Sequence, residues 1–307
     1  MPQTMPLRIA RIVAGRDVTR SLVCAVGVVS LIACSSEADN APRELPLIRI
    51  EARDLVFTVP TELKAGLTRI RLVNRGAVWH EAGVTRLPDG VTTEAYLAGA
   101  RAGDPFPVNA VDFGGPGLVA TGDSSEVVVE LEPGRYAIVC WSENHVKAGM
   151  IAPMVITVGD NGAGRSAVTS ADTQAVEPEG APTPTGEVRL EDFRFVHDSG
   201  VFRPGLNVLR VHNAGQRPHE LTVFKLEPGR TAQEFGVWIA TRQGAPPARP
   251  VGGMTTLAPA HGGWLLLDLS AGNYLVACGT PEQTANGIQI HARMGMAEVF
   301  EIPSGPQ

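Results

Sequence analysis

The chain has 307 residues, of which 44% are hydrophobic, 5% aromatic and 19% charged, and its formal net charge is −6. This length suffices for about two domains of ordinary size, and the hydrophobic fraction suffices for a packed core in each. The chain is acidic and has no cluster of Lys and Arg of the kind that binds phosphates, which argues against nucleic acid as a partner.

The first 33 residues have the features of a secretory signal peptide. Arg residues precede an apolar run at 21–33, which is too short to span a bilayer. The run ends in Leu-Ile-Ala followed by Cys34, which resembles the lipobox of bacterial lipoproteins. We therefore expect cleavage of residues 1–33, lipid on Cys34 and a polar tether at 34–45. The alternative is a plain signal peptide in which Cys34 is incidental.

A lipid on Cys34 predicts a location in the bacterial cell envelope. The protein would be anchored in the outer membrane and face the periplasm, or it would lie on the cell surface. Its contact with the membrane would then be through that lipid.

Two β-rich stretches are separated by a segment almost without large apolar residues. Short segments with period-two alternation of apolar and polar residues, such as 47–59, recur between Gly/Pro-rich turns. We expect an all-β fold of two tandem β-sandwich domains at 46–158 and 187–303. Residues 159–186 cannot bury a core, which predicts a flexible linker.

Each half also contains one candidate helix. In the first half it lies at 92–99. In the second half it follows a capping box that runs from Thr231 to Glu234.

The two halves repeat one order of chemically distinctive residues. An Asn-x-Gly-x-x-x-His segment ends at His80 and again at His219. Further on, Gly-x-Tyr-x-x-x-Cys is followed by a His and by Gly-Met. The repeated candidate ligands are His80, Cys140, His145 and Met150 in the first half, and His219, Cys278, His291 and Met296 in the second.

Two imidazoles, one thiolate and one thioether are the ligand set of a type 1 copper site. Each residue also has a plainer interpretation. The histidines could be turn residues, and the methionines could fill the core. Once Cys24 and Cys34 are accounted for by the signal segment, Cys140 and Cys278 could be small apolar core residues or could form one inter-domain disulfide.

Both halves resemble the cupredoxin family, most closely plastocyanin-like and azurin-like proteins. The resemblance rests on Asn-x-Gly-x-x-x-His and on Gly-x-Tyr-x-x-x-Cys followed by His and Gly-Met. It implies a Greek-key β-sandwich, a type 1 copper ion and single-electron transfer. It also implies that Asn74 and Asn213 tie the two ligand loops together and donate toward the thiolate.

The two copies differ in the loop between the Cys and the second His. Four residues separate Cys140 from His145, but twelve separate Cys278 from His291. The longer loop raises the entropic cost of closing the site and leaves His291 free to lie outside it, with Met294 as a competing thioether. We therefore expect one type 1 copper ion in the first domain and a second as possible in the second domain.

These patterns predict a membrane-anchored copper protein that transfers single electrons to or from a redox protein. The sequence does not identify that redox partner, and it indicates no small-molecule substrate. We expect no enzyme, because the chain has no His-x-His pair and none of the common hydrolase or nucleotide-binding motifs.

Two alternatives remain open. The first is a metal-free lipoprotein that binds another molecule and keeps the ligand residues as relics, in which case the thiol and imidazoles would not converge within about 5 Å. The second is copper storage or delivery through the same residues.

Overall fold

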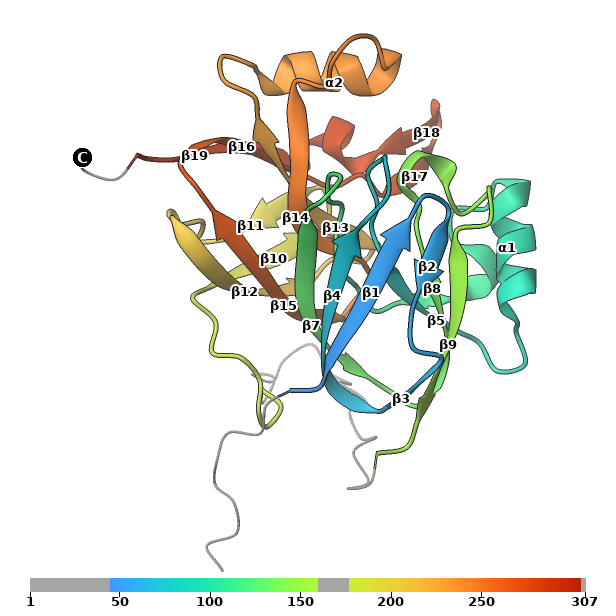
Figure 1. The fold of residues 1–307 in the computed structure, drawn as a ribbon. Coiled ribbons are helices and arrows are strands. Elements are labelled where there is room, and N and C mark those ends of the chain that lie inside the picture. Colours follow the sequence, from blue (N-terminus) through green and yellow to red (C-terminus); the bar gives the residue numbers. More distant parts are fainter. Residues whose placement is uncertain (1–44, 160–176, 305–307) are drawn as a thin grey trace, which may run out of the picture. The chain divides into compact units, whose positions relative to one another are not determined.

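The computed structural model describes residues 45–159 and 177–304, which form four β-sheets and two α-helices (Figure 1). The predicted signal peptide, Cys34, nearly all of the tether and residues 160–176 of the linker lie outside the described residues. Among the described residues, neither helix is long and apolar enough to cross a membrane.

The first half contains β1 (Leu47–Arg53), β2 (Val56–Thr58), β3 (Glu62–Lys64), β4 (Gly66–Asn74), β5 (Gly83–Leu87), α1 (Thr93–Ala102), η1 (Pro107–Asn109), β6 (Val111–Asp112), β7 (Ser124–Leu131), β8 (Gly134–Val139), η2 (Ser142–Asn144) and β9 (Ile151–Thr157). The second half contains β10 (Gly186–Glu191), β11 (Arg194–Val196), β12 (Gly205–Asn213), β13 (His219–Leu226), α2 (Ala232–Thr241), β14 (Ala248–Leu257), β15 (Gly262–Leu269), β16 (Gly272–Ala277), β17 (Pro281–Thr284), β18 (Gly287–Ile290), η3 (His291–Met294) and β19 (Ala297–Ile302).

The predicted all-β class is confirmed, and the period-two pattern is visible in strands such as β1, where exposed and buried residues alternate. The stretch 47–59 is a hairpin rather than one strand. Strands β1 and β2 pair antiparallel around a two-residue turn at Asp54 and Leu55. The second half repeats this hairpin with β10, β11 and a turn at Asp192 and Phe193.

One eight-stranded sheet runs through both halves, in the order β11-β10-β12-β15-β7-β4-β1-β2. Figure 1 shows β12, β15, β7 and β4 side by side in its centre. The halves join where β7 pairs antiparallel with β15, with Val129 opposite Gly263. The described residues of both halves accordingly belong to one compact unit, in which a continuous sheet joins the two halves.

Each half adds a second sheet of its own, and these sheets carry the repeated Cys strand. In the first half the order is β3-β9-β8-β5-β6, and in the second half it is β14-β13-β16-β19. Cys140 follows β8 and Cys278 follows β16, so the two cysteines occupy equivalent places. Most of the buried apolar side chains of both halves form one continuous core cluster, and two smaller clusters include side chains of α1 and α2.

A close backbone approach closes the junction between the halves. Gly117 N donates to Gly253 O at 2.8 Å. A Cβ on Gly117 would lie 2.6 Å from the Gly253 carbonyl carbon, and a Cβ on Gly253 would lie 2.1 Å from Leu221 O. Only glycine fits at these two positions, which explains why Gly117 and Gly253 occur where the halves meet.

Both predicted helices are present. Thr92 caps α1, and Thr231 with Glu234 forms the predicted capping box of α2. Tyr96 of α1 packs edge-on against Trp141, the residue after Cys140. Trp238 of α2 contacts Trp79 of the other half at 5.4 Å between ring centroids.

Candidate metal centres

The first half brings His80, Cys140 and His145 together. Strands β5 and β8 pair antiparallel with Gly83 opposite Val139, which places the segment before β5 beside the end of β8. The Cys140 sulfur lies 3.8 Å from His80 Nδ1 and 3.5 Å from His145 Nδ1. All three side chains are buried.

The second half brings His219, Cys278 and His291 together in the same way. The Cys278 sulfur lies 3.9 Å from His219 Nδ1 and 3.5 Å from His291 Nδ1. The two Nδ1 atoms are 3.0 Å apart. In each half the three donor atoms lie within 4.8 Å of one another, and the described part of the chain contains no third such group of His, Cys, Asp or Glu.

The expectation that the long loop leaves His291 outside the second centre is wrong. The extra residues fold into the hairpin β17–β18, in which Pro281 lies opposite Ile290. The hairpin therefore returns the chain to the place where it left, and the entropic cost of the loop is reduced by its own pairing. His291 is fully buried, so the geometry no longer favours the first centre over the second.

The two methionines occupy equivalent buried positions. Met150 N donates to His145 O at 3.0 Å, and Cys140 N donates to Met150 O at 3.3 Å. Met296 makes the matching bonds with His291 and Cys278. Met150 and Met296 are both fully buried, whereas the competing Met294 is only half-buried. The backbones of both predicted methionines therefore lie beside those of their Cys and His, and both side chains are buried.

The two asparagines brace the first ligand loop, but not through the sulfur. Asn74 Nδ2 donates to Val78 O at 2.7 Å and to Val119 O at 3.1 Å. Asn213 Nδ2 makes the matching bonds to Arg217 O and Leu257 O. Within the described ranges neither amide donates to a cysteine, so this part of the expectation is wrong.

The donor to sulfur in the second half is a backbone amide. Glu220 N donates to the Cys278 sulfur at 3.4 Å. This amide reaches the sulfur because it directly follows His219 on β13, and β13 pairs with β16, the strand that leads to Cys278. A side-chain donor is not needed at this place.

Burial shifts the pKa values of the candidate ligands. It lowers the pKa of His80 to about 4, with a further contribution from His145, and it lowers the pKa of His145, His219 and His291. It raises the pKa of the Cys140 thiol and brings that of Cys278 to about 12. Burial thus disfavours both free thiolate and free imidazolium.

The donor sets fit a bound transition-metal ion. With bonds of about 2.0–2.3 Å from nitrogen and sulfur, ligand atoms around one ion lie roughly 3–4 Å apart, as the observed separations do. A bound cation would compensate the charge of the thiolate and would bind the imidazoles in their neutral form. It therefore suits side chains whose free charged forms are disfavoured by burial. Cys140 and Cys278 are free thiols, which rules out the inter-domain disulfide.

Two glutamates that the sequence analysis missed support these centres. Glu81 follows His80 and accepts a hydrogen bond from Trp141 N at 3.0 Å. Glu220 follows His219 and accepts one from Gly279 N at 2.7 Å. Each thus ties its His segment to the residue after the Cys. The repeated His-Glu pair was the signal in the sequence that could have found them.

Both glutamates line one small cavity between the halves. Its volume is about 30 Å³, and Asp112 and Thr255 also line it. Burial raises the pKa of Glu81 to about 8, that of Glu220 to about 7 and that of Asp112 to about 6. These carboxyl groups therefore share an environment that favours their protonated forms.

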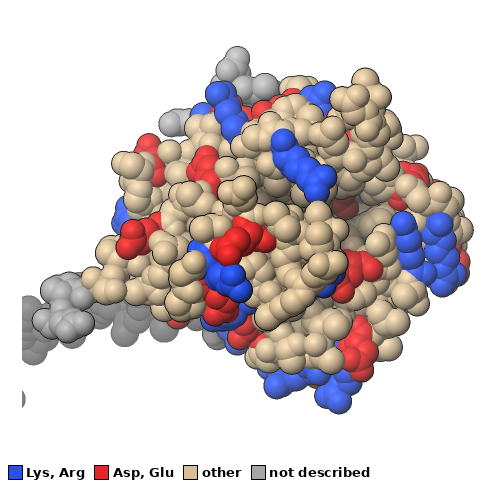
Figure 2. All heavy atoms as spheres, turned by 90° about the horizontal axis from the view of Figure 1, so that it is seen from above, with Lys and Arg blue, Asp and Glu red and all other residues tan. Residues whose placement is uncertain are grey.

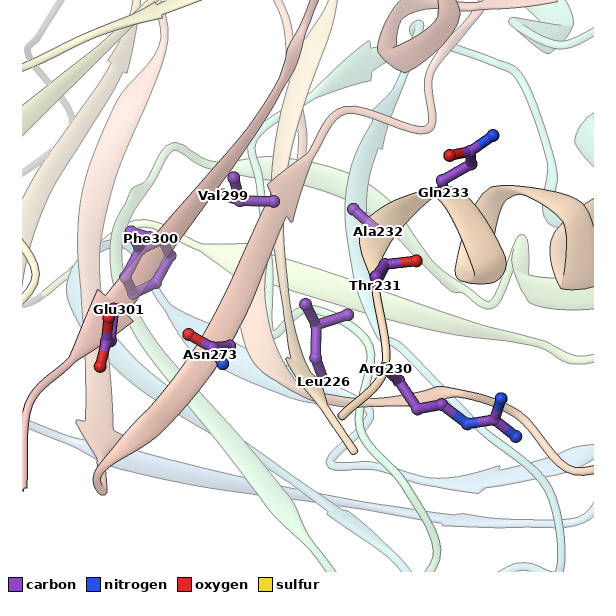
Figure 3. A pocket seen from close by; sticks show the side chains of 9 residues that line it. All are labelled: Leu226, Arg230, Thr231, Ala232, Gln233, Asn273, Val299, Phe300 and Glu301. Atoms are coloured by element: carbon purple, nitrogen blue, oxygen red, sulfur yellow. The ribbon is translucent and has the colours of Figure 1, made fainter. Parts of the chain in front are cut away.

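The larger surface hollow of the described residues lies away from both centres. A hollow of about 540 Å³ lies between the start of α2 and strand β19, where Arg230, Asn273 and Phe300 line it (Figure 3). It includes none of the candidate ligands. Figure 2 shows acidic and basic side chains interspersed on one face, without a broad area of one sign.

No family model and no curated protein matches the chain. Several solved structures are similar to it. Auracyanin B is 25% identical, with a TM-score of 0.28, over 37% of this chain and 91% of that one. Auracyanin A, a "blue" copper protein from Chloroflexus aurantiacus, is 22% identical, with a TM-score of 0.28, over 37% and 100%.

A longer match is the copper nitrite reductase from Nitrosomonas europaea, which is 12% identical, with a TM-score of 0.24, over 85% of this chain and 94% of that one. The structure itself fits the predicted resemblance. The chain has two β-rich halves, and each half presents a candidate copper-binding group of two His and one Cys with a buried Met beside it.

Proposed function

We propose that the protein binds copper at both centres and transfers single electrons. The observation that carries this proposal is the convergence of two imidazole Nδ1 atoms and one thiol on a common point, twice, inside the protein. When bound there, copper would supply a one-electron couple between Cu(I) and Cu(II). Trigonal His₂Cys sites with a weak axial Met are typical of electron-transfer copper.

The chain itself would hold the ligands in nearly one geometry in both redox states. The Cys and the two His lie at the ends of paired strands or in loops fixed by backbone bonds. Asn74 and Asn213 brace the loop before the first His, and Glu81 and Glu220 tie that His segment to the residue after the Cys. Rigid surroundings of this kind keep the reorganisation that accompanies electron transfer small.

Repeated redox cycling tests electron transfer against copper storage. The copper-loaded protein would be reduced and re-oxidised several times while its thiolate-to-copper absorption band and its bound copper are measured. We expect the band to vanish and return without loss of metal. Release of copper in each reduced phase would favour storage or delivery instead.

We also propose that the protein is anchored in the cell envelope through lipid on Cys34. The basis is the Leu-Ile-Ala sequence before Cys34 at the end of an apolar run. Mass spectrometry of the mature N-terminus and the membrane fraction of the Cys34→Ser variant test this. Unmodified Cys34, or membrane retention of the variant, would contradict it.

We further propose that the protein is not itself an oxidase or reductase of a small molecule, and that its partner is another redox protein. The remaining histidines have separate neighbours: His197 contacts Glu298, His212 contacts Glu187 and His261 contacts Pro259 O. They therefore offer no shared additional copper site. Oxygen- or nitrite-dependent turnover by the copper-loaded protein would contradict this proposal.

A further inference from the structure

The outward nitrogen atoms of the equivalent histidines His80 and His219 have different surroundings. His219 Nε2 lies 3.1 Å from Asp192 Oδ1. His80 Nε2 is buried and has no hydrogen-bond partner among the described residues. Asp54 occupies the place in the first half that Asp192 occupies in the second, since each is the first turn residue of the same hairpin.

The difference arises in the backbone of that turn. In the first half Asp54 has the positive φ, 52°, whereas in the second half Phe193 has it, 63°. The two turns therefore direct the Asp side chain differently. Asp192 Oδ1 also accepts from Gln216 N at 2.9 Å and from Arg217 N at 3.3 Å, which fixes the carboxylate over the loop that leads to His219.

The second histidine of that centre also faces a carboxylate. His291 Nε2 lies 3.4 Å from Glu282 Oε2, on the hairpin that the first half lacks. Arg217 forms ion pairs with both Asp192 and Glu282, at 3.0 Å each, and so joins the two carboxylates into one network. The position of Arg217 is taken in the first half by Val78, which cannot form such a network.

We propose that Asp192 and Glu282 are positioning residues that make the second centre the one with the lower copper reduction potential. A carboxylate that accepts the Nε2–H proton leaves Nδ1 free for the metal and raises the basicity of the imidazole. A more basic ligand and one net negative charge nearby stabilise Cu(II) over Cu(I). His80 has no acceptor on Nε2, and the nearby Asp54 acts on it through its charge alone.

The bond itself can be tested without metal, so this step does not depend on the proposed function. Nitrogen-15 NMR of the metal-free protein at pH 8 reports which nitrogen of each imidazole carries the proton. We expect His219 to carry it on Nε2, with a downfield, slowly exchanging resonance that moves upfield in Asp192→Asn. A proton on Nδ1 of His219, or a resonance that Asp192→Asn leaves unmoved, would overturn the inference.

The effect on copper rests on the proposed function and is measured one centre at a time. The Cys140→Ser background isolates the second centre, and the Cys278→Ser background isolates the first. We expect a lower potential at the second centre, a rise in that potential in Asp192→Asn or Glu282→Gln, and about 10- to 100-fold weaker copper binding in those variants. The matched control Asp54→Asn should leave the hydrogen-bonding of His80 unchanged, because His80 Nε2 has no partner to lose.

The outcomes separate the two proposals. If copper binds and the second centre does not have the lower potential, or Asp192→Asn does not raise it, the inference fails and the proposed function stands. If the protein binds no copper, the proposed function fails, and the NMR measurement alone decides whether Asp192 positions His219.

Discussion

The Cys278 sulfur and His291 Nδ1 are 3.5 Å apart although twelve residues separate them, the same distance as between Cys140 and His145, which are separated by four. The hairpin β17–β18 absorbs the difference in length. The convergence of the ligands at the second centre therefore depends on the two ends of the hairpin, while its body adds Glu282 beside His291.

Removal of residues 282–289 tests this relationship. Paired Cα atoms such as those of Pro281 and Ile290 are about 4.5–5.5 Å apart, close to the 3.8 Å of a peptide link, so the ends can be joined with a small shift. We expect the shortened chain to keep copper at the second centre, but with weaker binding and faster removal by a small chelator, because His291 loses both Glu282 and the chain that covers it. Loss of that copper in a folded variant would contradict this account.

The close contact between the halves predicts a large stability effect at one glycine. Gly117→Ala should lower the free energy of unfolding by about 2 kcal/mol or more, because the new Cβ would overlap the Gly253 carbonyl carbon. Gly236→Ala in α2 is the matched control. Nothing lies within 4 Å of a Cβ there, so it should stabilise by about 1 kcal/mol. Chemical denaturation measures both changes, and equal effects would contradict the prediction.

Asp112, which lines the cavity between the halves, should make the stability of the folded protein depend on pH. Burial raises the pKa of Asp112 to about 6, while Thr85 Oγ1 donates to it at 2.7 Å. A raised pKa means that the folded state holds the proton more tightly, so this stabilisation is complete below pH ~4 and is lost as the pH rises through about 6. Glu81 and Glu220 line the same cavity and also have raised pKa values, so their contributions to stability change with pH in the same direction.

Asp112→Asn isolates that contribution, because Asn does not titrate and can still accept from Thr85. The free energy of unfolding of the variant, measured relative to wild type, should be higher at pH 7 than at pH 4. The difference should be at most about 3 kcal/mol, since one pKa unit corresponds to about 1.4 kcal/mol. Thermal unfolding at the two pH values measures the difference. A variant whose relative stability is the same at both would show that Asp112 titrates normally.

Much of the fold and of both centres follows from local sequence patterns. Period-two alternation located the strands, the box at Thr231 and Glu234 located α2, and the repeated His, Cys, His and Met located the candidate ligands. These signals are short-range, because a strand face, a helix cap and a ligand loop are each encoded by neighbouring residues.

The features that were missed depend on long-range pairing. Nothing local to β7 or β15 indicates that Val129 and Gly263 become partners across the two halves. The pattern at 47–59 does not reveal the turn at Asp54, because a two-residue hairpin keeps the alternation on both sides of it. Asp54 and Asp192 differ in their reach to the histidine because the positive φ falls on Asp54 in one turn and on Phe193 in the other. The equal spacing of the two hairpins does not reveal this difference.

The central claim is that each half binds its own copper ion through its own cysteine. The most direct measurement is the metal content and visible charge-transfer absorption of the copper-loaded wild type, Cys140→Ser and Cys278→Ser proteins. We predict two copper ions in the wild type and one in each variant, with part of the absorption lost each time. A folded wild type that stays colourless and free of copper, or that takes only zinc at these ligands, would contradict the account.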